Sequence, residues 1–321
     1  MHKHPKVAGS GIRRSAGEWQ ELALRCELMR VLVTGWSSFL DGEATAGDVL
    51  SMEAVRDSLL EAGIDVDVAW SPRLRADGLS LEKADPDTYT HLLFVCGPAH
   101  GRQVRELHER FFHCRRLAVG VSIVATNDPA VTGFHHIIAR DQDGAKAHRD
   151  LAAVPQCAQV PVVGVVLAHA QHEYGNRQRH DDVHAVLTSW LGRQDCARLP
   201  FDTRLDSHDW RLPRTPSQLE SVIRRLDVVI TTRMHGLVLA LKNGIPALAV
   251  DPIAGGAKVR AQAAAWGWPA VVIVDSLTDA RLDQWWDWCR STECAVLVAH
   301  CRHEATLGTL VPRLLQEITT P

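Results

Sequence analysis

The chain has 321 residues, of which 46% are hydrophobic, and a formal net charge of −3. This length is ample for a packed core and favours two domains over one. The nearly balanced charge excludes a wholesale attraction to nucleic acid or to an anionic membrane surface, and the apolar runs are too short to span a membrane.

The cysteines and the N-terminal segment indicate the cellular compartment. The eight cysteines include no Cys-x-x-Cys pair, and several lie in apolar segments, where a reduced thiol behaves as a small hydrophobe. Residues 1–28 are basic and polar and contain no apolar stretch of signal-peptide length. We therefore expect a cytoplasmic protein with reduced thiols, in which residues 1–28 form a disordered or irregular extension.

Strand-like and helix-like patterns alternate from residue 29 onwards. Continuous β-branched runs predict strands that are buried on both faces, and apolar residues at helical spacing predict helices. The first series consists of strands at 30–36, 64–70, 91–97, 116–124 and 135–141, with helices at 47–63 and 102–114.

A break rich in turn residues and prolines spans 143–161, and the alternation then restarts. Ser217 followed by Glu220 is typical of a capping box and predicts a helix that starts there. The second series consists of strands at 160–168, 227–232, 245–250 and 270–275, a possible short strand at 201–205, and helices at 180–191, 217–226, up to 243, after the glycine-rich loop, 279–290 and 294–318.

This repeated alternation predicts an α/β protein with two Rossmann-like, doubly wound domains that face a cleft. We expect the N-terminal domain at 29–150 and the C-terminal domain, with its closing helices, at 151–321. Ligands of such sheets bind at the carboxyl ends of the strands. Polar residues that directly follow a strand are therefore the first candidates for a functional site.

One strand end carries two such residues. In the stretch DVVITTRMHGLVLAL, an apolar strand is followed by Arg233 and His235, and an apolar helix begins at about the same point. An arginine can hold a carboxylate or phosphate with two hydrogen bonds, and the free N–H groups of a helix start favour the same anion. A histidine at this corner can give or take a proton near neutral pH.

The sequence from Thr231 to Val259, TTRMHGLVLALKNGIPALAVDPIAGGAKV, resembles the C-terminal signature of the polysaccharide pyruvyl transferase family. The matching positions are Arg233, Met234, His235, Gly244, Pro246 and Lys258. A weaker resemblance extends over most of the chain from Arg30. It includes the pair Gly47 and Asp48, which opens a helix, and the pair Arg140 and Asp141, which ends a strand.

The resemblance implies both an activity and a site. The family moves the pyruvyl part of phosphoenolpyruvate onto sugar hydroxyls, leaving a ketal and free phosphate, on a fold like that of the GT-B glycosyltransferases. It implies an acceptor site in the N-terminal domain and a phosphoenolpyruvate site in the C-terminal domain. We expect neither cofactor nor metal, because cationic side chains can balance the charge in this reaction. His235 is then the expected catalytic residue, and the expected substrate-binding residues are Arg233, Met234, Gly236, Lys258, Asp48 and Arg140.

Two other functions fit the same pattern. One is a GT-B-like glycosyltransferase that binds a nucleotide sugar, and the other is a degenerate family member that binds a glycan without turnover. Individual residues also have simple structural interpretations. Arg233 and His235 can cap carbonyls, Lys258 can be solvated, Asp48 can cap its helix and Arg140 can form a salt bridge between domains.

Two composition features outside these motifs have both a structural and a functional interpretation. The histidine-rich stretch 169–184 lacks the His-Glu-x-x-His spacing, which favours a solvated segment over a metal site. It nevertheless follows a strand, so His169, His172 and Arg177 can contact a substrate. The tryptophans at 266–268 and 285–288 can stack on sugars, but we expect them to pack in a core or an interface.

Overall fold

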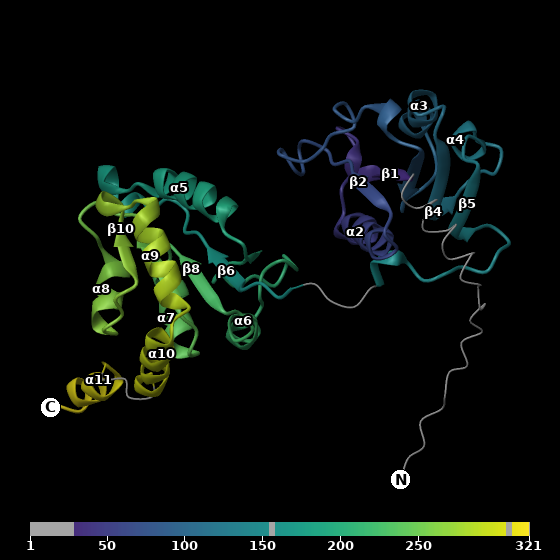
Figure 1. Ribbon diagram of the computed structural model, residues 1–321. Helices are drawn as coiled ribbons and strands as arrows, with labels where there is room; N and C mark the ends of the chain where they lie inside the picture. Colours follow the sequence, from purple (N-terminus) through teal and green to yellow (C-terminus); the bar gives the residue numbers. More distant parts are fainter. Residues whose placement is uncertain (1–28, 154–157, 306–309, 321) are drawn as a thin grey trace, which may run out of the picture. The chain divides into compact units, whose positions relative to one another are not determined.

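The computed structural model describes residues 29–153, 158–305 and 310–320 (Figure 1). The predicted extension at 1–28 lies outside the described residues. The chain divides into two compact units, Met1–Cys157 and Ala158–Pro321. Each unit contains one five-stranded sheet, and each is described by itself.

The first unit is built on a parallel sheet with the strand order β2-β1-β3-β4-β5. Its strands are β1 (Arg30–Thr34), β2 (Asp65–Val68), β3 (His91–Val95), β4 (Arg115–Ile123) and β5 (His136–Gln142). Its helices are α2 (Ala46–Glu61), α3 (Arg102–Arg110) and α4 (Pro129–Thr132), with short 3-10 turns η1 (Trp36–Ser38), η2 (Pro86–Thr88) and η3 (Leu151–Ala153).

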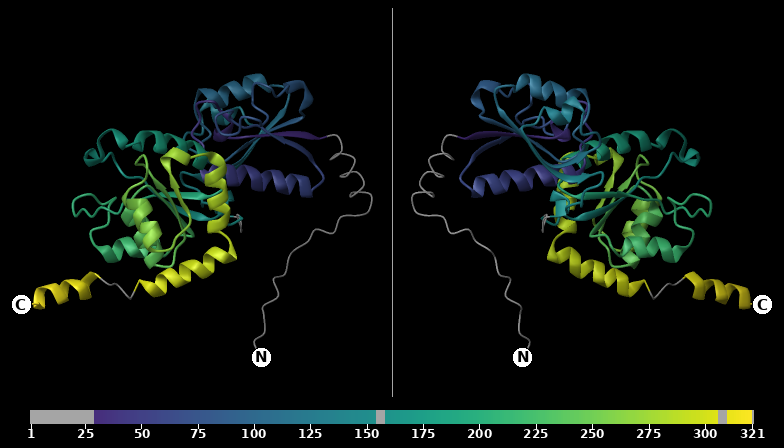
Figure 2. Two further views of the ribbon diagram at one scale, coloured as in Figure 1. Left: turned by 90° about the vertical axis from the view of Figure 1, so that its left-hand side faces the viewer. Right: turned by 90° about the vertical axis from the view of Figure 1, so that its right-hand side faces the viewer.

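Helices cover both faces of this sheet, and successive β1 residues point to opposite faces. Leu32 packs in the cluster that includes residues of α3 and α4, whereas Val31 and Val33 pack with Met52 of α2. All three strand residues are at most 6% exposed. Figure 2 shows the resulting three-layer arrangement of helix, sheet and helix. Burial on both faces is why the strand sequences are continuously apolar rather than alternating.

The chain turns sharply after β3. Cys96 and Gly97 have φ values of 64° and 72°, a left-handed conformation that a residue with a side chain rarely adopts. A Cβ atom on Gly97 would lie 2.2 Å from Cδ1 of Trp36, and the Trp36 indole N–H donates to the Pro98 carbonyl at 3.1 Å. The tryptophan that follows β1 therefore packs against the turn that follows β3.

The second unit has the same topology, with the strand order β10-β9-β8-β6-β7 and all neighbours parallel. Its strands are β6 (Val162–Val166), β7 (Ala197–Pro200), β8 (Val228–Thr231), β9 (Ala247–Asp251) and β10 (Val271–Ile273). Its helices are α5 (His180–Arg193), α6 (Pro216–Ile223), α7 (Met234–Lys242), α8 (Lys258–Ala265), α9 (Asp279–Cys289), α10 (Thr292–Glu304) and α11 (Leu310–Thr319), with turns η4 (His172–Arg177) and η5 (Val274–Ser276).

The tryptophans at 266–268 and 285–288 pack in or against the core of this unit, as expected. Trp190 of α5 and Trp286 of α9 are 0% and 5% exposed and meet edge to face, with ring centroids 6.0 Å apart. Trp268 is 2% exposed and packs on Trp288 at 5.2 Å, while its indole N–H donates to the Ala247 carbonyl. Contacts of this kind join α5 and α9 on one side of the sheet.

Three predicted elements of the second unit are wrong in detail. The short strand lies at Ala197–Pro200 rather than at 201–205, because these earlier residues pair with β6. The cap of α6 is Thr215, whose hydroxyl accepts from the Gln218 N–H, and Pro216 takes the first helical position. The predicted helix 294–318 consists of two helices, α10 and α11.

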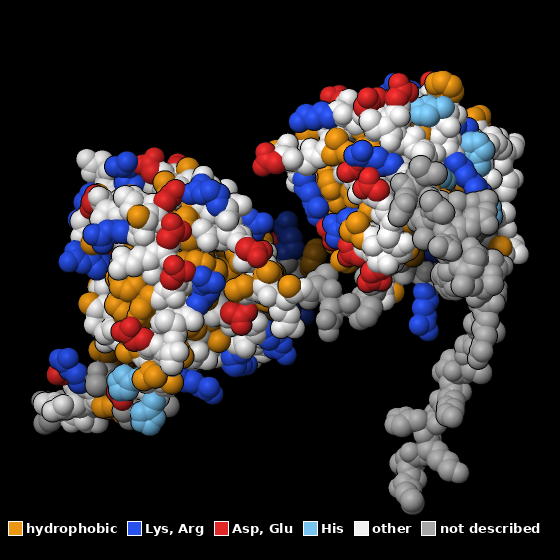
Figure 3. Space-filling view, viewed as in Figure 1, with side chains coloured by type: hydrophobic (Ala, Val, Ile, Leu, Met, Phe, Trp, Pro, Cys, Tyr) orange, Lys and Arg blue, Asp and Glu red, His pale blue; other side chains and the backbone are white. Residues whose placement is uncertain are grey.

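The two sheets confirm the prediction of two Rossmann-like, doubly wound domains, whereas the cleft that they were expected to face stays a prediction. No helix within the described residues is long and apolar enough to cross a membrane. On the face that Figure 3 shows, the Lys and Arg side chains are interspersed with Asp and Glu rather than gathered into one basic surface.

Candidate active site

Both sheets have the strand order 2-1-3-4-5 when their strands are numbered within the unit. In this topology the crevice for a ligand lies between the carboxyl ends of the first and third strands, where the chain direction of the connections reverses. In the second unit these strands are β6 and β8. The Thr232 hydroxyl accepts from the Ala168 N–H at 2.7 Å, so the segments that follow the two strands are joined directly.

The corner between β8 and α7 is built by Thr231. Its buried hydroxyl accepts from the Arg233 N–H at 2.9 Å and donates to the Arg233 carbonyl at 3.1 Å. Arg233 is the N-cap residue, and α7 begins at Met234. A Cβ atom on Gly236 would lie 2.3 Å from the Thr231 hydroxyl oxygen, so only glycine fits where the helix passes this hydroxyl.

The guanidinium of Arg233 has few partners. Its side chain is 22% exposed, and its Nη2 atom lies 3.8 Å from Oδ1 of Asp202. Its Nε atom is buried and has no hydrogen-bond partner among the described residues. A buried donor without an acceptor costs about 1–3 kcal/mol, so this guanidinium is ready to accept an anion.

Asp202 was not predicted as a site residue. It follows β7, and its carboxylate accepts from the N–H and the guanidinium of Arg204 at 3.0 and 2.7 Å. Burial alone would raise the pKa of Asp202, but the hydrogen bonds from Arg204 and the charge of Arg233 hold it below its ordinary value. The sequence misplaced this strand by several residues, so Asp202 was expected within it and not at its end.

The first turn of α7 presents free donors. In the described part of the chain, no group accepts a hydrogen bond from the N–H of Met234, His235 or Gly236. The ring of His235 is exposed, and no hydrogen bond joins it to another described residue. The side chain of Met234 packs against the core of the unit. Arg233 and His235 therefore lie together at the start of the helix, and Met234 anchors this start to the core.

The glycine-rich loop between β9 and α8 donates several of its N–H groups to carboxylates of the same unit. The buried carboxylate of Asp251 accepts from the N–H groups of Ala257 and Arg260, at 2.7 and 2.9 Å, and from that of Ile253 at 3.1 Å. Asp275 accepts from the Gly255 N–H at 2.6 Å. The chain's own carboxylates thus fill this helix start.

Lys258 is the first residue of α8 and is not simply solvated. Its Nζ atom lies 3.7 Å from Oε1 of Glu173 and 5.7 Å from the centre of the Tyr174 ring. The side chain remains 38% exposed. The segment after β6 thus contributes a counter-ion to Lys258, and this contact links the loops that follow β6 and β9.

A short ladder joins the same two loops next to His180. The Arg179 N–H donates to the Pro252 carbonyl at 2.8 Å, and the Ala254 N–H donates to the Arg177 carbonyl at 2.9 Å. His180 itself is 3% exposed, and neither ring nitrogen has a partner among the described residues. The expectation of a solvated histidine segment is therefore wrong at this position.

The His180 ring lies 6.4 Å from the ring of His184, centre to centre. Burial, and then the neighbouring ring, lower the pKa of His180, and burial likewise lowers the pKa of His184. Both rings are thus expected to be neutral at pH 7. Across the described ranges, no group of three or more His, Cys, Asp or Glu side chains gathers in a way that could hold a metal ion.

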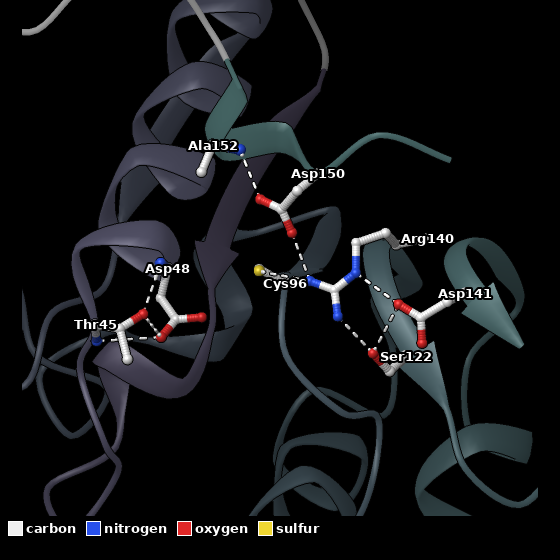
Figure 4. A network of polar contacts seen from close by, with 8 residues as sticks. All are labelled: Thr45, Asp48, Cys96, Ser122, Arg140, Asp141, Asp150 and Ala152. Atoms are coloured by element: carbon white, nitrogen blue, oxygen red, sulfur yellow. Dashed lines mark hydrogen bonds and ion pairs between the residues drawn. The ribbon is translucent and has the colours of Figure 1, made fainter. Parts of the chain in front are cut away.

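The other two predicted site residues lie in the first unit. Arg140 donates to Asp141 at 2.6 Å, to Asp150 at 2.5 Å and to Ser122 at 2.7 Å, with the Cys96 sulfur 3.8 Å away (Figure 4). Hydrogen bonds to Asp141 and Asp150 raise the pKa of Arg140. This arginine joins the end of β5 to the segment that leads into η3, all within one unit.

Asp48 closes a capping box at the start of α2. Its Oδ2 atom accepts from the Thr45 N–H at 3.2 Å and from the Thr45 hydroxyl at 2.7 Å, and the Thr45 hydroxyl accepts from the Asp48 N–H. Figure 4 shows that the carboxylate of Asp48 and the guanidinium of Arg140 lie on either side of Cys96. Asp48 thus caps its helix through Oδ2, and its Oδ1 atom has no hydrogen-bond partner among the described residues.

The fold and the corner define an α/β protein with two parallel sheets and an arginine–histidine pair at the switch point of the second. The family model for polysaccharide pyruvyl transferase matches residues 178–252, which include His180, Asp202, Arg233 and His235. The predicted resemblance is confirmed over this segment. None of the curated proteins compared with the chain matches it.

Solved structures similar to the chain include three glycosyltransferases. Spinosyn rhamnosyltransferase SpnG, complexed with thymidine diphosphate, is 14% identical over 91% of this chain and 100% of its own, with a TM-score of 0.34. MurG of Acinetobacter baumannii is 14% identical over 90% and 99%, with a TM-score of 0.31. Heptosyltransferase WaaC of E. coli, with ADP, is 13% identical over 81% and 97%, with a TM-score of 0.25.

Proposed function

We propose that the protein transfers the pyruvyl group of phosphoenolpyruvate to hydroxyls of a sugar, glycan or glycoconjugate, forming a pyruvate ketal and phosphate. The family match at 178–252 supports the class of reaction. The observation that carries the proposal is the incomplete coordination of Arg233. Its Nε atom has no partner among the described residues, and its nearest carboxylate lies 3.8 Å away and is already held by Arg204.

Phosphoenolpyruvate suits these donors because it carries a planar carboxylate and a phosphate. An arginine binds either group with two parallel hydrogen bonds, and the free N–H groups of α7 add donors at the positive end of the helix dipole. Lys258 supplies a second positive charge from the start of α8, which follows the neighbouring strand β9. In this proposal Arg233 gives up its weak contact with Asp202 and binds the ligand with two hydrogen bonds.

The reaction begins with a proton delivered to the methylene carbon of phosphoenolpyruvate, which leaves an oxocarbenium-like centre. A sugar hydroxyl adds to this carbon and loses its proton. The C–O bond to phosphate then breaks, and a second hydroxyl adds and loses its proton to close the ketal. Of the two protons released, one balances the proton delivered to carbon and the other leaves with phosphate.

We assign the proton transfers to His235. Its ring is exposed at the start of α7 and is free of hydrogen bonds to other described residues, so it can reach a ligand held by Arg233. A positioned histidine contributes typically ~10²–10⁴-fold to such a step. We assign the acceptor to the first unit, where the Oδ1 atom of Asp48 has no hydrogen-bond partner in the part of the chain described.

The test is a thermal-shift titration with phosphoenolpyruvate. A ligand that binds only the folded state stabilises it by mass action and so raises Tm. The gain in the free energy of unfolding is about 2.7 kcal/mol at a ligand concentration of a hundred times the Kd. The Arg233→Ala variant should stay folded and lose the shift. Arg225→Ala is the matched control, because Arg225 is an exposed arginine that precedes the same strand at its opposite end.

Each alternative has its own outcome. A shift with UDP, GDP or CMP but not with phosphoenolpyruvate would support a nucleotide-sugar glycosyltransferase instead. A phosphoenolpyruvate shift without acceptor-dependent phosphate release would indicate a binding protein without turnover. An Arg233→Ala variant that keeps the full shift would show that the anion is bound elsewhere.

A further inference from the structure

Trp210 is the most exposed large hydrophobic side chain among the described residues, at 92%. Every other described tryptophan is buried or half-buried. An indole buries a large apolar area when it finds a partner, so an indole that is fully in water lacks the contact that would stabilise it. The exposure of Trp210 is therefore a feature that the core of the protein does not explain.

The loop that carries Trp210 is ordered by its own hydrogen bonds. The Asp206 N–H donates to the Pro213 carbonyl at 3.0 Å and closes the loop at its base. Oδ1 of Asp206 accepts from the His208 N–H at 2.7 Å. The Leu212 N–H donates to the Asp209 carbonyl at 3.0 Å. Trp210 thus sits on a compact closed loop, and such loops frequently carry function.

The same loop touches the candidate site for the donor. The loop follows β7, and β7, β6 and β8 are parallel neighbours in the sheet. It therefore leaves the sheet at the same carboxyl end as Arg233, which follows β8. Its first polar residue, Asp202, lies 3.8 Å from Nη2 of Arg233. Loop 201–214 and the donor site are therefore continuous, and both fall inside the segment that the family model matches.

The neighbours of Trp210 indicate what kind of ligand fits. The side chain of His208 is 95% exposed, and that of Arg211 is 72% exposed, with its guanidinium held flat against the Asp209 carboxylate by hydrogen bonds of 2.8 and 2.9 Å. An exposed aromatic face on a loop that also carries exposed polar side chains suits a sugar ring, which has apolar C–H faces and hydroxyls at its edge.

We infer that Trp210 is a platform for a sugar ring of the acceptor and that loop 201–214 forms part of the acceptor site. This inference rests on the proposed function, since it names how the same site recognises its second substrate. Because Asp202 belongs to both the loop and the contact with Arg233, donor and acceptor sites share one structural element.

The test is direct binding of the full-length protein to an array of mannosides, galactosides, glucosides and N-acetylhexosaminides, without phosphoenolpyruvate. Trp210→Ala should weaken binding to the bound glycans by roughly five- to tenfold, the effect of losing one aromatic contact. Trp210→Phe, which keeps a ring, should retain most of the affinity. Phe112→Ala is the matched control, because Phe112 is 74% exposed and lies in the first unit.

Kinetics supply a second reading if turnover is detected. Trp210→Ala should then raise the KM for the acceptor by a similar factor and leave the KM for phosphoenolpyruvate unchanged. Because Trp210 contacts solvent, its replacement should not change Tm, and unfolding does not complicate the result.

Four outcomes separate the hypotheses. Binding that depends on Trp210 in a protein that phosphoenolpyruvate does not stabilise supports the sugar platform and contradicts the proposed donor. A normal phosphoenolpyruvate shift with glycan binding unchanged in Trp210→Ala overturns the platform alone. Failure of the wild type to bind any glycan of the array also overturns it. So does a change in oligomeric state in Trp210→Ala with glycan binding intact, because Trp210 would then contact a second copy.

Discussion

Arg233 and His235 stand two positions apart, yet their surroundings differ sharply. Arg233 is 22% exposed, with one buried nitrogen that lacks a partner among the described residues, whereas His235 is exposed in the first turn of α7. This difference suits a division of labour in which the arginine holds the donor and the histidine moves protons. The two roles can be separated because binding and turnover are measured independently.

We expect His235→Gln to bind phosphoenolpyruvate and to lose turnover by ~10²-fold or more at saturating donor, because glutamine hydrogen-bonds but cannot shuttle a proton near neutral pH. The measurement is phosphate release at saturation beside a thermal-shift titration of the same variant. If saturated turnover stays near normal and only donor affinity falls, His235 is a binding residue. Arg225→Ala again serves as the control.

At the scale of the element, the approach of α7 to β8 determines where the site lies. The helix starts directly under the Thr231 hydroxyl, and this close passage is possible only because residue 236 has no side chain. By contrast, Gly192 lies inside α5, and a Cβ atom there would meet nothing within 4 Å. We therefore expect alanine substitutions at these two helical glycines to have opposite effects on stability.

Gly236→Ala should destabilise the protein by about 1–3 kcal/mol, because the added methyl group overlaps the Thr231 oxygen and the corner must shift. Gly192→Ala should be neutral or stabilise by about 0.5–1 kcal/mol, since alanine favours a helix interior. Urea denaturation measures both changes. Equal effects of the two substitutions on stability would contradict the packing described for α7. Gly236→Ala should also weaken the thermal shift with phosphoenolpyruvate, because a shift of this corner would displace Arg233.

At the scale of the whole molecule, histidine burial makes stability depend on pH. Burial is the main cause that lowers the pKa of His91, His108, His180 and His184 below 6.5. In the unfolded chain these rings regain their ordinary pKa and bind protons first as the pH falls. Stability is then fully present above about pH 6.5 and is lost as the pH falls from there toward the lower pKa of the folded state.

We therefore expect Tm to fall between about pH 7 and pH 5, with each histidine contributing at most about 1.4 kcal/mol per pH unit. His180→Gln should make this dependence shallower, because glutamine does not titrate. Aspartates with lowered pKa, such as Asp141 and Asp209, act only below about pH 4 and do not overlap this range. A Tm that is constant over the range, or rises toward pH 5, would contradict the burial of these rings.

The sequence by itself determined the class of fold and the position of Arg233 and His235 at the end of a strand. Continuous β-branched runs require burial on both faces, which only a parallel sheet covered by helices supplies, and an arginine after such a run must lie at a carboxyl edge. The position of Arg233 and His235 could therefore be predicted from the local pattern, whereas their role in a site stays a prediction. Lys258 was also placed correctly at the start of a helix, because glycine-rich loops and helix starts are local features.

Only the tertiary structure decided which other groups meet them. Asp202, Glu173 and Asp251 are far from one another in the chain, and the parallel crossovers bring the first into contact with Arg233 and the second into contact with Lys258. The carboxylate of the third is buried and accepts from N–H groups at the start of α8. Burial of His180 and exposure of Trp210 likewise depend on distant packing, because the same residue types occur in water or in a core with similar local sequence.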